Sequence, residues 1–192
     1  MLSDQLSFDF RADSKSNLVY FALRPDWDAG RAIIQEARQC SNRYGLTGTI
    51  YDPGRLHVSL NAVMSPRGPR KGDVAAAVRA AEKVAMRPFA VSLNRLLTFR
   101  NNDRNPIVLG FGDGAADIAD LRNALREESL KAGLWRGPVR FRPHVTLLRD
   151  RRTVPETRLD EPIRWTVTDF ILVHSLVGRG RQIELGRWQL GR

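Results

Sequence analysis

Residues 143–147 read PHVTL, and residues 56–60 read LHVSL. In each stretch a histidine is followed two places later by a hydroxyl residue. The two pairs are His144 with Thr146 and His57 with Ser59. The flanking apolar residues are typical of a strand with one buried face. Because residues i and i+2 of a strand point to the same side, each strand presents an imidazole and a hydroxyl to one surface.

The two motifs occupy equivalent places in two strand–helix–strand units. The predicted elements are strand 17–23, helix 27–44 and strand 56–63 in the first unit, and strand 106–111, helix 115–132 and strand 144–149 in the second. A shift of 87 residues lays the first unit on the second and carries His57 onto His144. We interpret this as two lobes related by a pseudo-twofold axis, although two ordinary units would give the same spacing by coincidence.

Further elements complete the chain. Hydrophobic patterns and turn signals predict strands at 49–51, 89–99, 163–176 and 181–190, and a helix at 73–86. We expect residues 1–16 to form a flexible lead-in and residues 17–192 to form a single two-lobed domain.

Composition excludes several classes of protein. No run approaches the roughly 18 apolar residues of a membrane-spanning helix, so we exclude an integral membrane protein. The single cysteine, Cys40, excludes an internal disulfide framework. The first residues lack the pattern of a secretory signal, so we expect a cytoplasmic protein. We also expect a monomer.

The balance of charge points to an anionic partner. The chain has 31 Lys and Arg against 21 Asp and Glu, a formal net charge of +10. Such an excess favours nucleic acid, although an ordinary solvated basic surface would show the same balance. Basic loops at 65–72 and 149–152 are candidates for guiding a nucleic-acid backbone.

Two imidazoles around one point suit displacement at phosphorus. An imidazole titrates near neutrality, so one neutral histidine can accept a proton while a protonated partner donates one. The hydroxyls of Ser59 and Thr146 can donate hydrogen bonds to an anion held between them. No further His or Cys lies at ligand spacing, so we expect no metal and no cofactor. The third histidine, His174, lacks the paired hydroxyl, and we assign it a structural role.

These motifs resemble those of the two-histidine (2H) phosphoesterase superfamily, and within it the RNA 2′,3′-cyclic phosphodiesterases, historically called 2′-5′ RNA ligases. The matching segments are VYFAL at 19–23, LHVSL at 56–60, RPHVTLLRD at 142–150 and FILVHSL…LGRWQL at 170–190. The resemblance implies an α+β fold of two pseudo-twofold-related lobes. Each lobe is an antiparallel sheet flanked by helices, and the active site lies in a cleft between them.

The resemblance also assigns roles to residues. It implies that His57 and His144 are the acid/base pair, and that Ser59 and Thr146 bind phosphate. It implies that Arg149 contacts the phosphate. Ideal strand alternation places Arg149 on the face opposite His144, whereas Arg142 has the matching parity and is a rival phosphate ligand. Relatives commonly carry an aromatic residue where this chain has Gln182, which leaves base stacking and substrate preference open.

We therefore expect metal-independent hydrolysis of an RNA terminal 2′,3′-cyclic phosphate to a 2′-phosphomonoester, with reverse 2′-5′ ligation implied by the resemblance. The expected partners are RNA ends or small cyclic nucleotides. One alternative is a phosphodiesterase acting on a small cyclic nucleotide, an ADP-ribose cyclic phosphate or a 2′-5′ oligoadenylate. Another is an RNA-binding module without catalysis. We take His144 as the base and His57 as the acid, although the sequence does not decide between the two assignments.

Overall fold

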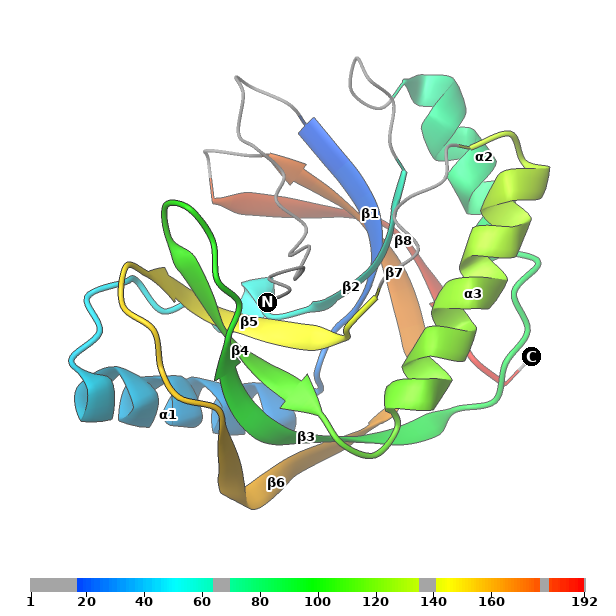
Figure 1. Ribbon diagram of the computed structural model, residues 1–192. Helices are drawn as coiled ribbons and strands as arrows, with labels where there is room; N and C mark the ends of the chain where they lie inside the picture. Colours follow the sequence, from blue (N-terminus) through cyan, green and yellow to red (C-terminus); the bar gives the residue numbers. More distant parts are fainter. Residues whose placement is uncertain (1–16, 64–69, 135–140, 177–179, 192) are drawn as a thin grey trace, which may run out of the picture.

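The computed structural model describes residues 17–63, 70–134, 141–176 and 180–191 (Figure 1). The lead-in at 1–16 and most of the basic loop at 65–72 lie outside the described residues. The described strands are β1 (Asn17–Leu23), β2 (Val58–Val63), β3 (Phe89–Thr98), β4 (Asn105–Phe111), β5 (His144–Asp150), β6 (Thr157–Val167), β7 (Asp169–Leu176) and β8 (Arg181–Gln189). The helices are α1 (Trp27–Tyr44), α2 (Lys71–Ala81) and α3 (Ala115–Lys131), with a 3₁₀ turn η1 (Pro53–Arg55).

The strands form two four-stranded sheets, which confirms the predicted α+β class. Sheet A has the order β2-β1-β7-β8, and sheet B has the order β5-β4-β3-β6. All neighbouring strands within each sheet are antiparallel. The sheets are equivalent strand by strand, since β2, β1, β7 and β8 match β5, β4, β3 and β6 in order. The predicted two-lobed repeat is therefore visible in the topology.

The helices join the two sheets into one core. Helix α1 packs against β5 and β6 of sheet B, whereas α3 packs against α2 and β2 of sheet A. The helix of each repeat therefore packs on the sheet of the other repeat, and Figure 1 shows α1 between β5 and β6 and α3 beside α2. One buried apolar cluster accordingly contains residues of both sheets.

Helix α1 shows why the sequence prediction was accurate in this segment. Asp26 caps its first turn by accepting a hydrogen bond from the backbone N–H of Ala29 at 2.9 Å. Gly45 ends the helix with φ of 58°, a left-handed conformation that glycine adopts without steric cost. The helix buries Ile33 and Ala37 on its sheet-facing side, and this burial follows the predicted helical spacing.

The structure corrects three predicted elements. Residues 49–51 are not a strand, although the N–H of Tyr51 donates a hydrogen bond to the carbonyl of Leu147 on β5 at 2.8 Å. The predicted strand at 163–176 is two strands, since β6 ends in sheet B and β7 begins in sheet A on either side of Thr168. No glycine or proline marks that change of sheet. Helix α2 begins at Lys71 and ends at Ala81, five residues before the predicted end.

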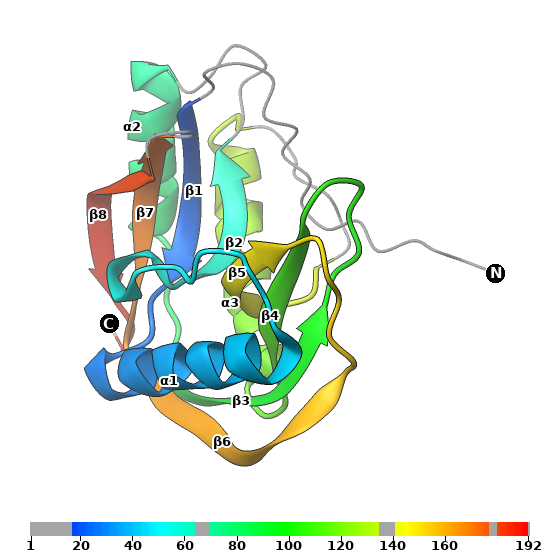
Figure 2. The same cartoon turned by 90° about the vertical axis from the view of Figure 1, so that its left-hand side faces the viewer.

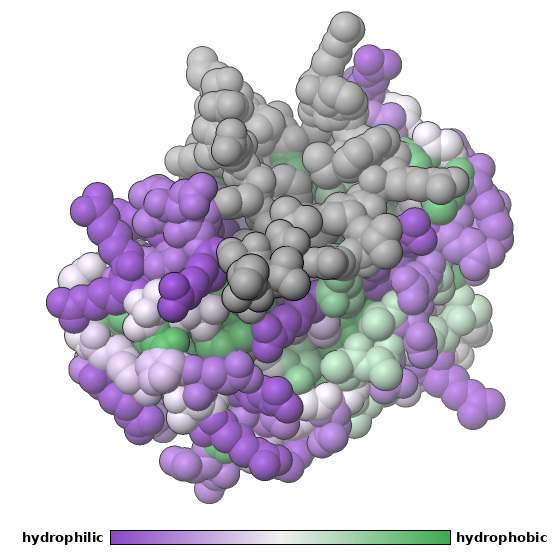
Figure 3. Space-filling view, in the orientation of Figure 1, coloured by the Kyte–Doolittle hydropathy of each residue, from purple (hydrophilic) through white to green (hydrophobic). Residues whose placement is uncertain are grey.

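Hydrophilic residues dominate the surface around α1 and the β3–β4 hairpin, as the space-filling view shows (Figure 3). Hydrophobic residues show between them and toward α3. Within the described part of the chain, no helix combines the length and apolar character needed to cross a bilayer.

Candidate active site

The two histidine motifs lie at the junction of the sheets. His57 immediately precedes β2, and His144 is the first residue of β5. Strands β2 and β5 contact each other although they belong to different sheets. Both views of the ribbon show the two strands side by side (Figures 1 and 2). The fold therefore brings together two histidines that are far apart in the sequence.

The predicted alternation is present in both motifs. Val58 and Val145, which separate each histidine from its hydroxyl residue, are fully buried. Both histidines are half-buried, Ser59 is exposed, and Thr146 is half-buried. Each motif thus anchors its strand with apolar side chains and turns its polar side chains away from the core.

The two imidazoles are held in the same way. Nδ1 of His57 lies 2.6 Å from the carbonyl oxygen of Arg55, and Nδ1 of His144 lies 2.8 Å from the carbonyl oxygen of Arg142. A carbonyl only accepts, so Nδ1 carries the proton in both rings and donates it. Among the described residues no hydrogen bond reaches Nε2 of either ring. Nε2 is therefore the nitrogen that each ring offers for chemistry.

An aromatic ring fixes the orientation of each imidazole. Tyr20 lies against His57 with ring centroids 5.2 Å apart. Phe99 meets His144 edge-on with centroids 4.7 Å apart. Tyr20 lies on β1 of sheet A and Phe99 directly follows β3 of sheet B, so each sheet supplies one ring, although β1 and β3 are not equivalent strands of the repeat.

Arg149 reaches the face of His144 through a β-bulge. In the ladder with β4, Thr146 pairs with Val108 and Leu148 pairs with Ile107, so Leu147 is an extra residue. Leu147 and Leu148 are both buried, and Arg149 then points to the same side as Thr146. The prediction that strand alternation places Arg149 on the face opposite His144 was therefore wrong, because it assumed an uninterrupted strand.

A matching irregularity in sheet A strengthens the repeat. The register between β1 and β2 shifts between Tyr20 and Ala22, opposite Leu60 and Asn61. This is the place in β2 that corresponds to the bulge in β5. Ala62 follows the irregularity where Arg149 follows the bulge, so only one lobe supplies an arginine at this position.

Burial lowers the pKa of His57 to about 4. The hydrogen bond to the Arg55 carbonyl opposes this shift, and the positive charges of His144, Arg24 and Arg55 add to it. The charge of His144 thus acts directly on His57, which agrees with their meeting at the sheet junction.

Burial also lowers the pKa of His144. The hydrogen bond to the Arg142 carbonyl opposes the shift, while the charges of Arg149 and Arg142 add to it. Both rings therefore favour the neutral form in the free protein, and a bound anion would favour the protonated form.

The site belongs to a known family. The chain matches the 2′-5′ RNA ligase superfamily over residues 25–179, a span that includes both histidine motifs. The chain belongs to this superfamily. A curated relative, the RNA 2′,3′-cyclic phosphodiesterase of Escherichia coli strain K12, is 33% identical over 87 residues. That match covers 43% of this chain and 48% of the relative, so it spans about half the length of either protein.

Solved structures share the fold over nearly the whole chain. A crystal structure of a phosphoesterase has a TM-score of 0.72 at 22% identity and covers 92% of this chain and 99% of its own. E. coli LigT complexed with NADP+ has a TM-score of 0.71 at 23% identity and covers 91% and 98%. The MHV ns2 PDE domain has a TM-score of 0.54 at 10% identity and covers 79% and 98%. These likenesses confirm the two-lobed α+β fold expected for the superfamily.

Sequence reasoning missed Arg55 as a counterpart of Arg142. Each arginine precedes a motif histidine by two residues, and each holds that histidine with its carbonyl oxygen. The guanidinium of Arg55 lies 4.6 Å from the ring centroid of Tyr51, and that of Arg142 lies 5.5 Å from the ring centroid of Phe99. The sequence did contain a signal for this equivalence. RLHVSL at 55–60 and RPHVTL at 142–147 both begin with an arginine two places before the histidine.

Gln182, the position at which the sequence leaves base stacking open, lies on the site side of sheet A. Its side-chain amide donates a hydrogen bond to the hydroxyl of Tyr20 at 2.9 Å. Tyr20 in turn lies against His57, so Gln182 is connected to the site through one ring. The chain therefore has a polar amide, and not an aromatic ring, at this position beside the site.

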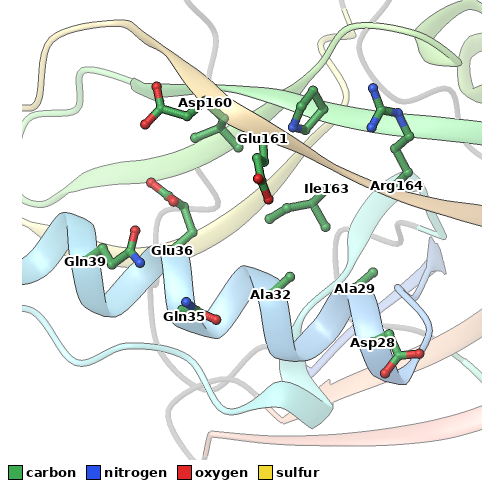
Figure 4. Close-up of a pocket in the computed structure, with 12 residues that line it drawn as sticks. Asp28, Ala29, Ala32, Gln35, Glu36, Gln39, Asp160, Glu161, Ile163 and Arg164 are labelled. Atoms are coloured by element: carbon green, nitrogen blue, oxygen red, sulfur yellow. The ribbon is translucent and has the colours of Figure 1, made fainter.

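A separate groove lies on the far side of sheet B, between α1 and β6. It has a volume of about 480 Å³ and is lined by the carboxylates of Asp28, Glu36, Asp160 and Glu161 (Figure 4). Burial raises the pKa of Glu36, and the nearby charge of Asp160 adds to the shift. An acidic groove repels phosphate, so the sheet junction and not this groove is the candidate site.

Proposed function

We propose that the protein hydrolyses a 2′,3′-cyclic phosphate at an RNA end to a 2′-phosphomonoester. The observation that carries the proposal is the pair of equivalent imidazoles at the sheet junction, each presenting Nε2 while Nδ1 is held by a carbonyl. Membership in the superfamily and the name of the curated relative support the same substrate class.

The reaction needs one proton acceptor and one proton donor. Neutral Nε2 of one histidine accepts a proton from water as the water oxygen bonds to phosphorus. The bond between phosphorus and the 3′ oxygen breaks, and the protonated Nε2 of the other histidine gives its proton to that oxygen. The products are a 2′-phosphomonoester and a 3′-hydroxyl. A 5′-hydroxyl in place of water, attacking phosphorus as the bond to the 3′ oxygen breaks, gives a 2′-5′ phosphodiester and a 3′-hydroxyl by the same two proton transfers.

The surrounding donors stabilise the charge on phosphorus. The hydroxyls of Ser59 and Thr146 lie on the same strand faces as the two histidines and donate to phosphate oxygens. Arg149, brought to this face by the bulge, supplies a guanidinium that can bind two oxygens at once. Arg142 supplies a second positive charge beside His144. Binding of the anion raises the pKa of the imidazoles and so protonates the acid.

An RNA oligonucleotide that ends in a 2′,3′-cyclic phosphate tests the function. The protein converts it to the 2′-phosphomonoester, and EDTA leaves the rate unchanged. Chromatography that separates the 2′- and 3′-phosphate products identifies the bond that breaks. Absence of turnover, or accumulation of the 3′-phosphate, would contradict the proposal.

The pH dependence follows from the lowered pKa values. Activity falls at low pH when the base becomes protonated, and it falls at high pH when the acid loses its proton. Because both pKa values lie below the ordinary 6.5, and that of His57 is about 4, kcat/KM has a bell-shaped profile with its maximum below pH 6.5. The kcat profile lies at higher pH, because bound phosphate favours the imidazolium. A kcat/KM maximum above pH 7.5 would contradict this account.

Replacement of Arg149 by alanine removes a charged hydrogen-bond donor from the phosphate. We expect kcat/KM for the oligonucleotide to fall by about 10- to 100-fold. Lysine at this position recovers only part of the loss, because an ammonium group cannot make the paired contact. Arg158→Ala, at an exposed position of β6, is the matched control and changes kcat/KM by less than about 2-fold. Equal losses in the two variants would show that Arg149 acts only through net charge.

A further inference from the structure

A second group of positive charges lies on the sheet-A side of His57. Arg24 follows the end of β1, and Arg55 ends η1, directly before the first histidine motif. The charges of both arginines act on His57 and on Tyr20. Arg55 also holds His57 through its carbonyl and lies over the ring of Tyr51. We call Arg24 and Arg55 the sheet-A arginine pair.

Both members of this pair have a buried donor without an acceptor. Nε of Arg24 and Nε of Arg55 are buried, and neither has a hydrogen-bond partner among the described residues. The side-chain oxygen of Gln182, whose amide nitrogen bonds to Tyr20, is likewise buried and unpartnered. A buried guanidinium N–H that meets no acceptor leaves part of the arginine's charge without a partner, and an anion beside the accessible part of the guanidinium would offset that charge.

The nearby carboxylate leaves most of this charge uncompensated. Glu184 lies 3.5 Å from Nη1 of Arg24. The same carboxylate is held more closely by Arg187, which contacts both of its oxygens at 2.8 and 2.9 Å. Within the described ranges, Arg55 forms no ion pair with any carboxylate. The pair therefore keeps a net positive charge beside the imidazoles.

A single cyclic phosphate cannot use all of these donors. It carries one negative charge, and Arg142 and Arg149 already stand beside His144 on the opposite lobe. The sheet-A arginine pair stands beside His57. The reacting phosphate occupies the 2′ and 3′ oxygens, so any other phosphate on the same nucleoside is bonded to its 5′ oxygen.

We infer that Arg24 and Arg55 bind a second phosphate group of the substrate, the one on the 5′ oxygen of the terminal nucleoside. The inference rests on the proposed function for the position of the reacting phosphate. The sheet-A arginine pair thereby selects substrates that carry a 5′-linked phosphate over a simple nucleoside cyclic phosphate. That phosphate is either the internucleotide diester of RNA or the 5′-monoester of a free nucleotide.

Calorimetric titration with product analogues tests this subsite without relying on turnover. The ligands are adenosine 2′-monophosphate, adenosine 2′,5′-bisphosphate and a diadenylate that ends in a 2′-phosphate. In the wild-type protein the added 5′-linked phosphate lowers Kd by about 10-fold or more. In the double variant Arg24→Gln/Arg55→Gln the added 5′-linked phosphate lowers Kd by less than about 3-fold. Tighter binding of the bisphosphate favours the monoester source, and tighter binding of the diadenylate favours RNA.

The controls separate charge, folding and function. Arg164→Gln removes one exposed arginine at the acidic groove and keeps the full gain in affinity. Arg24→Lys/Arg55→Lys keeps the positive charge and recovers part of the affinity that the 5′-linked phosphate adds. Circular dichroism verifies that each variant is folded. Equal affinity of the wild type for ligands with and without the 5′-linked phosphate would overturn the inference, as would an undiminished gain in the double glutamine variant.

Turnover distinguishes failure of the inference from failure of the proposed function. Equal kcat/KM for adenosine 2′,3′-cyclic phosphate and its 5′-phosphorylated form overturns the subsite and leaves the proposed function standing. Binding that depends on the sheet-A arginine pair, with no hydrolysis of any cyclic phosphate, overturns the proposed function and leaves the subsite standing.

Discussion

Alanine in place of His57 or His144 lowers kcat/KM for a cyclic-phosphate-ended oligonucleotide by about 10²- to 10⁴-fold in either variant. Each substitution removes one of the two Nε2 atoms through which a proton must pass. Neither histidine donates a side-chain hydrogen bond that holds two elements together, since each Nδ1 bonds only to a carbonyl two residues away. Steady-state kinetics of the two variants, with the fold verified by circular dichroism, checks the expectation.

His174 provides the matched control for this experiment. It lies on β7 opposite Val19, and Val19 belongs to the main core and not to the site face of sheet A. We expect His174→Ala to change kcat/KM by less than about 3-fold. Full activity of either motif-histidine variant would exclude the acid/base pair, whatever the result for His174.

Alanine at Gly48 lowers the free energy of unfolding by about 3 kcal/mol. A Cβ at this position would overlap the backbone carbonyl of Arg149 and would press on the side chain of Leu148. The contact is close because the backbone N–H groups of Thr47 and Gly48 donate to Oδ2 of Asp150 at 2.6 and 2.7 Å. The closest overlap is with the backbone carbonyl of Arg149, which belongs to β5 and cannot move aside as a flexible side chain could.

The Gly48→Ala substitution should also disturb the position of His57 and the bulge in β5. The segment that contains Gly48 leads into η1 and His57, and the N–H of Tyr51 donates to the carbonyl of the bulge residue Leu147 at 2.8 Å. We therefore expect kcat/KM to fall together with stability. Thermal unfolding should show a loss of about 6–12 °C.

Gly30 is the matched control for the Gly48 variant. It lies within α1, and a Cβ there meets nothing within 4 Å. Gly30→Ala should raise the free energy of unfolding by about 0.5–1 kcal/mol, because alanine favours the helix. If Gly48→Ala is as stable as the wild type, the close approach of this segment to β5 is not a feature of the folded protein.

The carboxylate of Asp150 makes the same connection sensitive to acid. Hydrogen bonds from the backbone N–H groups of Arg152, Gly48 and Thr47 lower its pKa, although burial opposes the shift. A carboxyl whose pKa is lowered on folding stabilises the protein above its unfolded pKa of about 3.9. That contribution is lost as pH falls through the lower folded value. The imidazoles act in the same direction, because their lowered pKa values reduce stability as pH falls below about 6.5.

The repeat and the paired histidines were readable in the sequence because local rules governed them. Helix α1 has a capping Asp26 and a terminal Gly45, and β2 and β5 alternate buried and exposed residues through each motif. These features depend on near neighbours in the chain. The 87-residue shift then follows from elements of matching length.

The errors arose where distant contacts override local patterns. The passage from β6 to β7 at Thr168 has no turn residue, so only the choice of sheet separates the two strands. Residues 49–51 look like a strand, yet their neighbours are held by the carboxylate of Asp150, which lies about one hundred residues further along the chain. A sequence pattern contains no record of such a partner.

The position of Arg149 shows most clearly what strand alternation in the sequence cannot predict. Strict alternation places it away from His144, and one extra residue in the ladder reverses that result. The adjacent pair Leu147 and Leu148, both buried, was the available signal, because two consecutive apolar residues interrupt an alternating strand. The equivalent irregularity in β2 involves Asn61, whose polarity concealed it.

The central claim is that Nε2 atoms from the two lobes meet at one phosphate. A crystal structure of the protein with adenosine 2′-monophosphate tests it most directly. We expect the phosphate at the junction of β2 and β5, within hydrogen-bond distance of Nε2 of both His57 and His144. A phosphate that contacts only one of the rings, or that binds elsewhere while the junction stays empty, would contradict the account.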